Sequence, residues 1–234
     1  MKITMLAKPN DTTHSNSNFK RIIEIYLFVN PIGSKCYTSE KEVLSFVEGL
    51  EQKVHFRFIP FHNFQTVTKY MQFHNLPEKN LAFRNQICTS TYQASLAYKA
   101  ALMQGKKKGR AYLMQLQSEL IEDNSLFSEN LLIQVAEKVN LDVEMFIEDK
   151  NSDFAKASYE EDQRIAREMQ IESNPSMVVF DNQNDDYGLL VEDCISVDLL
   201  KKLCNPKSSL KENHKKMFIQ TEHTPLQKKN LRVL

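Results

Sequence analysis

The sequence predicts an α/β protein with a central mixed sheet and a large helical insertion. Its expected elements follow the order strand, helix, strand, helical block, strand, strand, helix. The strands are predicted from short apolar runs in the first and last parts of the chain, one of which alternates with period two. The helical block is predicted from a spacing of three to four residues between apolar positions. With 5 Gly and no Trp among 234 residues, a many-turned all-β sandwich is disfavoured.

The first half of the sheet is expected within residues 21–63. Residues 22–29 form an apolar run that Asn30, Pro31 and Gly33 end, and helical spacing follows over residues 43–50. Apolar side chains alternate again over residues 54–60. Strand, helix and strand within about forty residues predict a right-handed βαβ unit with parallel strands.

Residues 64–170 are expected to form the helical insertion, with about five helices and no proline inside any of them. The longest is predicted over residues 83–105, where Gly105 is suited to stop a helix. Ser128 is expected to cap a later helix, whose apolar residues recur at helical spacing over residues 131–139.

The second half of the sheet is expected within residues 171–204. A tight apolar run, Ser176–Phe180, follows Asn174 and Pro175, and a polar turn separates it from residues 187–191. These two runs predict an antiparallel hairpin, and residues 197–203 predict a short closing helix.

The two ends of the chain differ in composition from the predicted domain. Residues 1–20 are mostly polar and are expected to be a flexible leader. Residues 205–234 hold seven Lys or Arg against two Glu, and are expected to form a mobile basic tail.

Charge and cysteine usage exclude several classes of function. The 30 basic and 30 acidic side chains cancel, so neither nucleic acid nor a membrane is an expected partner. No secretory apolar segment opens the chain, and the four Cys residues (36, 88, 194 and 204) form no C-x-x-C pair, which favours a cytoplasmic protein with reduced thiols. The histidines lack metal-ligand spacing, so no metal site is expected.

Two local motifs suggest a family. The run Asn30-Pro-Ile-Gly-Ser-Lys-Cys-Tyr37 resembles the D-P-x-C-P-x-C-Y loop of DsbA-like proteins, and Asn174-Pro175 before a strand resembles their cis-proline loop. The resemblance covers about residues 22–204. It implies a thioredoxin-like fold with a large helical insertion, and a cis peptide bond that would turn Asn174 toward residues 33–36.

A third stretch of sequence indicates one branch of this family. Residues 92–101 and 104–110 resemble the YjbH/SpxH branch of the DsbA-like family. Members of that branch are adaptors that bind the transcription regulator Spx and promote its degradation by the ClpXP protease. No cofactor is expected for this chain. The resemblance therefore implies a non-enzymatic adaptor.

The resemblance also implies a degenerate active site. Gly33 stands where the family has its first Cys, and Cys36 aligns with the second, so a dithiol cycle cannot close within this loop. Cys36 can be a small buried residue or a redox-sensing thiol, and the first interpretation is favoured. The alternative function is a thiol-dependent enzyme, either an atypical oxidoreductase or a kappa-type glutathione transferase in which Ser34 and Lys35 activate the ligand thiol.

A basic cluster, Lys106, Lys107, Lys108 and Arg110, has two interpretations. Cations near a helix C-terminus are stabilising, which gives a structural reason for some of them. Four of them around two glycines exceed that need, so the cluster is also a candidate docking patch for an acidic partner surface.

Overall fold

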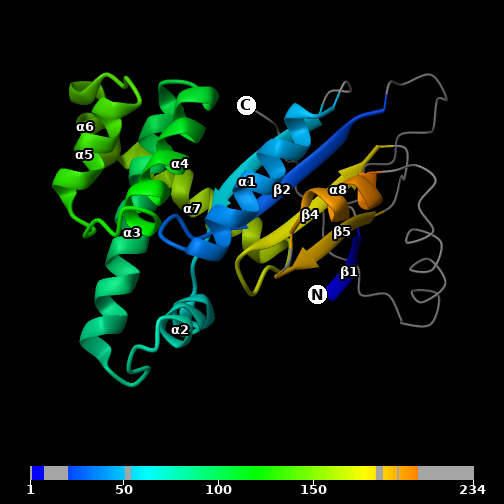
Figure 1. The fold of residues 1–234 in the computed structure, drawn as a ribbon, viewed down its shortest axis with the longest axis horizontal. Coiled ribbons are helices and arrows are strands. Elements are labelled where there is room, and N and C mark those ends of the chain that lie inside the picture. The colour runs from blue at the N-terminus through cyan, green and yellow to red at the C-terminus, as the bar shows by residue number, and fades with distance from the viewer. Residues whose placement is uncertain (1, 8–20, 51–53, 183–186, 194, 205–234) are drawn as a thin grey trace. The chain divides into compact units, whose positions relative to one another are not determined.

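The structure is a computed structural model that describes residues 2–7, 21–50, 54–182, 187–193 and 195–204, and it contains a five-stranded sheet. The strand order is β1-β5-β4-β2-β3 (Figure 1). The strands are β1 (Lys2–Ala7), β2 (Ile23–Val29), β3 (Val54–Pro60), β4 (Ser176–Asp181) and β5 (Tyr187–Glu192). The mixed α/β fold with inserted helices is therefore confirmed.

Strand β1 corrects the expectation of a flexible leader. Lys2–Ala7 pairs antiparallel with β5, from Lys2 opposite Glu192 to Ala7 opposite Tyr187. The register sets Ile3 opposite Val191, so the short apolar sequence gains cross-strand partners at an otherwise open sheet edge. The rest of the predicted leader, residues 8–20, and the predicted basic tail, residues 205–234, lie outside the described residues.

The predicted βαβ unit is present as β2, helix α1 (Ser34–Glu48) and β3. Strand β2 is almost fully buried, which explains its nearly continuous apolar sequence. Helix α1 ends at Glu48, and Gly49 follows it.

The inserted segment contains six helices between residues 64 and 176. They are α2 (Phe64–Phe73), α3 (Leu81–Met103), α4 (Lys106–Ile121), α5 (Glu129–Lys138), α6 (Val143–Asn151) and α7 (Asp153–Glu168). Side-chain caps fix five of their N-termini, including the predicted cap Ser128, whose Oγ accepts the Leu131 N–H at 3.1 Å. Among the described helices, none is long and apolar enough to cross a membrane.

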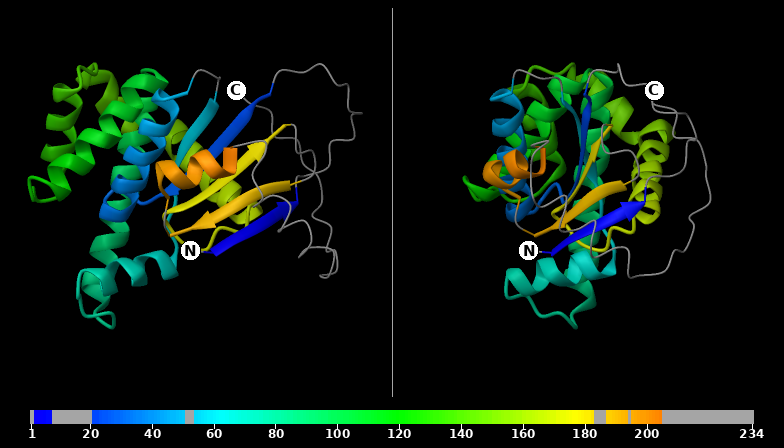
Figure 2. Two further views of the ribbon diagram at one scale, coloured as in Figure 1. Left: turned by 45° about the vertical axis from the view of Figure 1, so that its right-hand side comes forward. Right: turned by 90° about the vertical axis from the view of Figure 1, so that its right-hand side faces the viewer.

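The second half of the sheet closes with β4, β5 and helix α8 (Val197–Cys204). Strands β4 and β5 are neighbours and run in opposite directions, as the predicted hairpin requires (Figure 2). Arg21, just before β2, donates to both carboxylate oxygens of Asp181 at the end of β4 and to the Cys204 carbonyl oxygen.

The chain divides into two compact units. One comprises residues 1–27, 42–57 and 177–234, and the other comprises residues 28–41 and 58–176. The end of β2, the start of α1 and the end of β3 group with the inserted helices in the second of these units. We call the second group the helical unit; it contains every candidate site residue.

Candidate functional site

The loop that precedes α1 is organised by one buried side chain. Asn30 Oδ1 accepts the Ile32 N–H at 3.1 Å, and the Asn30 carbonyl oxygen accepts the Gly33 N–H at 2.9 Å. A Cβ at Gly33 would lie 3.3 Å from the Asn30 oxygen and Cβ, which is a tight contact. Gly33 therefore lets the loop close against Asn30, and a larger residue requires a shift of a few tenths of an ångström.

Cys36 lies inside the first turn of α1. It is 2% exposed, and its Sγ accepts the Asn30 N–H at 3.1 Å. Burial raises the pKa of this thiol far above its ordinary value, which outweighs the lowering by the Asn30 N–H. The prediction of a small buried residue is confirmed, and the protonated thiol is a poor nucleophile.

Ser34 and Lys35 begin α1 beside this buried thiol. Lys35 is exposed and directs its Nζ to a point 5.1 Å from the centroid of the Phe73 ring on α2. Lys35 therefore contacts α2 through a cation–π interaction with Phe73.

The predicted cis-proline loop is confirmed, with a cis Asn174–Pro175 bond directly before β4. The Asn174 Nδ2 donates to the Phe61 carbonyl oxygen at 2.8 Å. The Phe61 N–H in turn donates to the Val29 carbonyl oxygen at 2.8 Å. The loop is thus tied to the end of β2 through Phe61.

Helix α2 and its N-cap residue contact Lys35 of the degenerate loop and the segment just before Pro175. The sequence analysis assigned no role to this helix. At its start, Asn63 forms a capping box with Thr66 and donates from Nδ2 to the Glu172 carbonyl oxygen, near Pro175. At its end, Phe73 lies under the Lys35 ammonium. The sequence places a Phe at each end of this ten-residue helix, and both are exposed although Val67 and Met71 of the same helix are buried.

His62 forms a hydrogen bond with a neighbouring tyrosine, Tyr159. Its Nδ1 lies 2.7 Å from the Tyr159 hydroxyl, and the two rings stack. Burial lowers the pKa of His62 and raises the pKa of Tyr159, so both groups are neutral near pH 7. Within the described residues no three His, Cys, Asp or Glu side chains are placed to hold a metal ion.

The basic cluster lies at the start of a helix, which corrects the expectation of a helix C-terminus. Helix α3 ends at Met103, Gly105 takes a positive φ of 123°, and α4 begins at Lys106. The sequence reasoning missed this because only two residues separate the helices. A Cβ at Gly109 would lie 2.6 Å from Leu102 Cδ2, so Gly109 permits the close approach of α3 and α4.

The cluster is therefore electrostatically unfavourable for its own helix. Lys106, Lys107 and Lys108 are exposed, the first turn holds no acidic residue, and Gly105 offers no side-chain cap. Cations at a helix N-terminus oppose the helix dipole. Stabilisation of a helix C-terminus therefore does not explain the cluster. Its interpretation as a docking patch stays a prediction.

Together, the sheet order, the inserted helices and the cis-proline loop define a thioredoxin-fold protein of the DsbA-like class. Residues 26–202 match the family described as Thioredoxin. The chain resembles a putative protein disulfide isomerase from Nitrosomonas europaea (TM-score 0.59, 12% identity, 77% of this chain and 95% of that one). It also resembles a DsbA from Pseudomonas aeruginosa (TM-score 0.56, 15% identity, 92% and 96%).

Curated relatives identify the branch. The "ClpXP adapter protein SpxH" of Bacillus subtilis is 30% identical over 206 residues, covering 81% of this chain and 69% of the relative. The protein of the same name from Staphylococcus saprophyticus is 30% identical over 187 residues, covering 80% and 66%. The chain thus spans about two thirds of their length. It belongs to the thioredoxin family and, within it, to the group of SpxH adapter proteins.

Burial of Cys36 predicts low reactivity toward thiol reagents. In the folded protein at pH 7.5, iodoacetamide should modify Cys36 at least ~100-fold more slowly than in urea, since the thiol must first be exposed by opening of the fold. Peptide mapping by mass spectrometry gives the rate for each cysteine, and the half-buried Cys88 is the internal control. Equal rates for Cys36 and Cys88 would contradict the buried, protonated state.

Proposed function

We propose that this protein is a cytoplasmic adaptor that binds Spx and presents it to the ClpXP protease. The observation that carries the proposal is the 30% identity to proteins named "ClpXP adapter protein SpxH" over most of this chain. An adaptor raises the local concentration of a substrate at the protease, so it requires a binding surface and no chemistry of its own.

We further propose that the protein is not an enzyme. A dithiol oxidoreductase needs an accessible thiolate at the start of the helix, and here that position is Gly33, while Cys36 is buried and protonated. Ser34 and Lys35, the residues of the glutathione-transferase alternative, remain accessible. The loop therefore lacks the thiolate that dithiol chemistry needs, and the transferase alternative is tested with glutathione as described below.

The basic cluster at Lys106, Lys107, Lys108 and Arg110 is a proposed contact for an acidic surface of the partner complex. It keeps exposed cations at a helix end that disfavours them. Exposed charge of one sign mainly accelerates association. Reversal of Lys106, Lys107 and Lys108 to Glu should therefore slow association and leave the dissociation rate nearly unchanged.

The proposed function is tested with purified ClpXP, ATP and Spx. Addition of this protein should accelerate Spx degradation about tenfold or more at low Spx concentration, and the effect should fade as Spx saturates the protease. The adaptor itself should not be consumed. Cys36→Ser should retain full stimulation, because the proposal assigns no role to the thiol.

A ClpXP substrate that needs no adaptor is the control, and its degradation should not change. If Spx neither binds at micromolar concentration nor disappears faster, the adaptor proposal fails. The enzyme alternative is then tested by thermal shift with glutathione, since a ligand at 100 times its Kd stabilises a protein by about 2.7 kcal/mol.

A further inference from the structure

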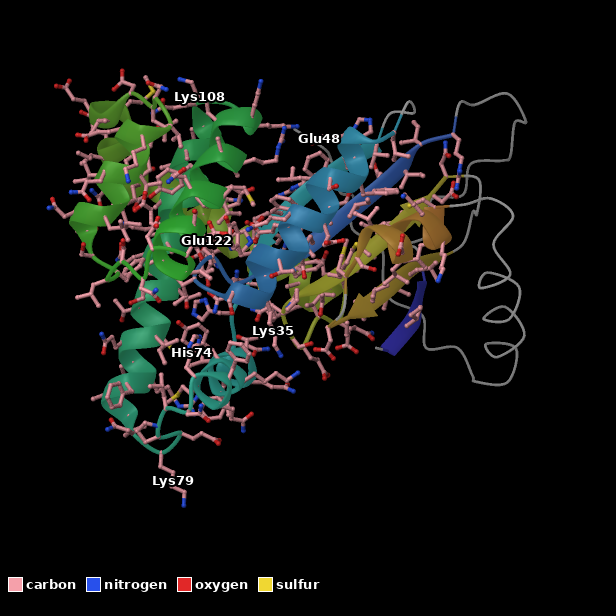
Figure 3. The ribbon with its side chains drawn as sticks, viewed as in Figure 1. Lys35, Glu48, His74, Lys79, Lys108 and Glu122 are labelled. Atoms are coloured by element: carbon pink, nitrogen blue, oxygen red, sulfur yellow. The ribbon has the colours of Figure 1, made fainter. Side chains whose placement is uncertain are left out.

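Charge is strongly segregated along the helical unit. Residues 58–110 hold eight basic side chains and one acidic side chain, Glu78, whereas residues 111–176 hold five basic and fifteen acidic side chains. The zero net charge of the whole chain conceals this division. Of the eight basic side chains, Arg84 and Lys99 on α3 are buried. The exposed cations therefore lie on α2 (Lys69), directly before α3 (Lys79, labelled in Figure 3) and in the first turn of α4 (Lys106, Lys107 and Lys108).

Exposed apolar side chains gather on part of the same surface. Among the described residues, eight large apolar side chains are exposed, and four of them lie within residues 64–83: Phe64 (74%), Phe73 (53%), Leu81 (71%) and Phe83 (40%). Helix α2 instead buries Thr66, Val67 and Met71. We call residues 64–84 the α2–α3 corner. A cluster of exposed aromatic and aliphatic side chains on a folded protein indicates an interaction surface.

Two of these rings are held in place by cations. The Arg84 guanidinium carbon lies 4.1 Å from the Phe64 ring centroid, and Arg84 is itself fixed by hydrogen bonds to Thr68 Oγ1 (2.9 Å) and the Glu78 carbonyl oxygen (3.1 Å). Lys35 lies over Phe73 in the same way. Rings that are ordered before binding lose little entropy on contact with a partner, which favours affinity.

We propose that the α2–α3 corner, together with Lys35, docks a segment of the delivered protein that carries apolar side chains flanked by Asp or Glu. The apolar side chains of that segment cover Phe64, Phe73 and Leu81, and its carboxylates face Lys35, Lys69 and Lys79, which are all exposed. This assignment rests on the proposed adaptor function and specifies the face that such an adaptor uses.

A protein partner fits the corner better than a membrane does. Phe64 and Phe73 are nine residues apart, so at 100° per residue they lie on opposite flanks of α2. An interfacial membrane helix needs its apolar side chains on one face in order to lie flat. Side chains that project to both flanks of a short helix are suited instead to a partner that wraps around it.

The test compares two triple variants that remove exposed apolar side chains from the same unit. Phe64→Ser, Phe73→Ser and Leu81→Ser alter the corner, and Leu126→Ser, Met145→Ser and Phe154→Ser alter side chains of similar exposure elsewhere. Titration of full-length Spx should show Kd raised about 10- to 100-fold by the corner variant and less than about twofold by the control. Circular dichroism melting curves of all three proteins check that each variant is folded.

A charge-reversal pair tests the acidic character of the segment. Lys69→Glu with Lys79→Glu should lower the association rate for Spx about tenfold at low salt and flatten its salt dependence, whereas Lys156→Glu on the acidic side should not. If the wild-type protein does not bind Spx, the adaptor function fails and this docking assignment falls with it. If wild type binds and the corner variant binds equally well, only the docking assignment is overturned. Binding of anionic phosphatidylserine vesicles that the corner variant loses, with Spx affinity unchanged, would assign the corner to a membrane surface and likewise overturn the proposal.

Discussion

Glu40→Gln should make the folded protein more resistant to urea at pH 8 to 9 and should change its stability little below pH 5. Glu40 lies on α1 with no exposed surface, and Gln117 Nε2 donates to its Oε1 at 3.0 Å. Its Oε2 and the Gln117 Oε1 have no hydrogen-bond partner among the described residues. Both of these oxygens are acceptors when Glu40 is ionised, so neither can donate to the other. When Glu40 is protonated, its Oε2 can donate a hydrogen bond to the Gln117 amide oxygen.

The pH dependence follows from the pKa of Glu40, which burial raises from 4.5 to about 8. A carboxyl group whose pKa is higher in the folded than in the unfolded state stabilises the fold while it holds its proton. Below pH 4.5 both states are protonated; between about pH 4.5 and 8 the unfolded chain loses the proton and the folded protein keeps it. Stability therefore falls by about 1.4 kcal/mol per pH unit in this window, up to about 5 kcal/mol in total.

Urea unfolding at pH 5, 7 and 9 measures the effect. A Gln at position 40 can exchange two hydrogen bonds with Gln117 at every pH, so the difference between variant and wild type should grow steadily up to about pH 8. Glu48→Gln, at the exposed end of α1, is the matched control and should follow the wild type. A difference that stays constant from pH 5 to 9 would show that Glu40 is ionised in the folded protein.

The spacing of residues along α1 indicates that Glu40 is buried, whereas its charge alone indicates an exposed position. Cys36, Glu40, Val43 and Val47 recur at spacings of four, three and four residues, which places the carboxyl group on the inner stripe of α1. A charged residue at such a position is normally assigned to the surface. Its partner Gln117 lies 77 positions away on α4, and no local pattern connects the two.

The other structural features also fall into two groups, those determined by local sequence and those determined by contacts between distant residues. Strand β2, the βαβ unit, the hairpin and the Ser128 cap follow from local apolar spacing and turn residues, and the sequence predicts them. Strand β1 depends on an open edge of β5, and the position of the basic cluster depends on the tight reversal at Gly105. The role of α2 depends on contacts with Lys35 and Glu172, which only the folded chain brings to its two ends.

Asp162→Ala should destabilise the protein by about 3–5 kcal/mol, the usual cost of leaving one charge of a buried ion pair without its partner. Lys99 Nζ lies 2.6 Å from Asp162 Oδ2, and the exposures of the two side chains are 6% and 1%. The pair joins α3 to α7 within the helical unit. A loss of this size is a large fraction of the 5–15 kcal/mol by which folded domains are typically stable.

The double variant Lys99→Met with Asp162→Leu separates the cost of an unpaired charge from the net contribution of the ion pair to the free energy of unfolding. Because apolar side chains of similar volume leave no charge to desolvate, the double variant should recover most of the stability that Asp162→Ala loses. Glu161→Ala, which breaks an exposed ion pair with Arg164 on the same helix, should change the free energy of unfolding by less than about 1 kcal/mol. Urea unfolding of the four proteins gives these differences directly. If Asp162→Ala costs no more than Glu161→Ala, water reaches Lys99 in the folded protein, and the contact between α3 and α7 is looser than the side-chain burial indicates.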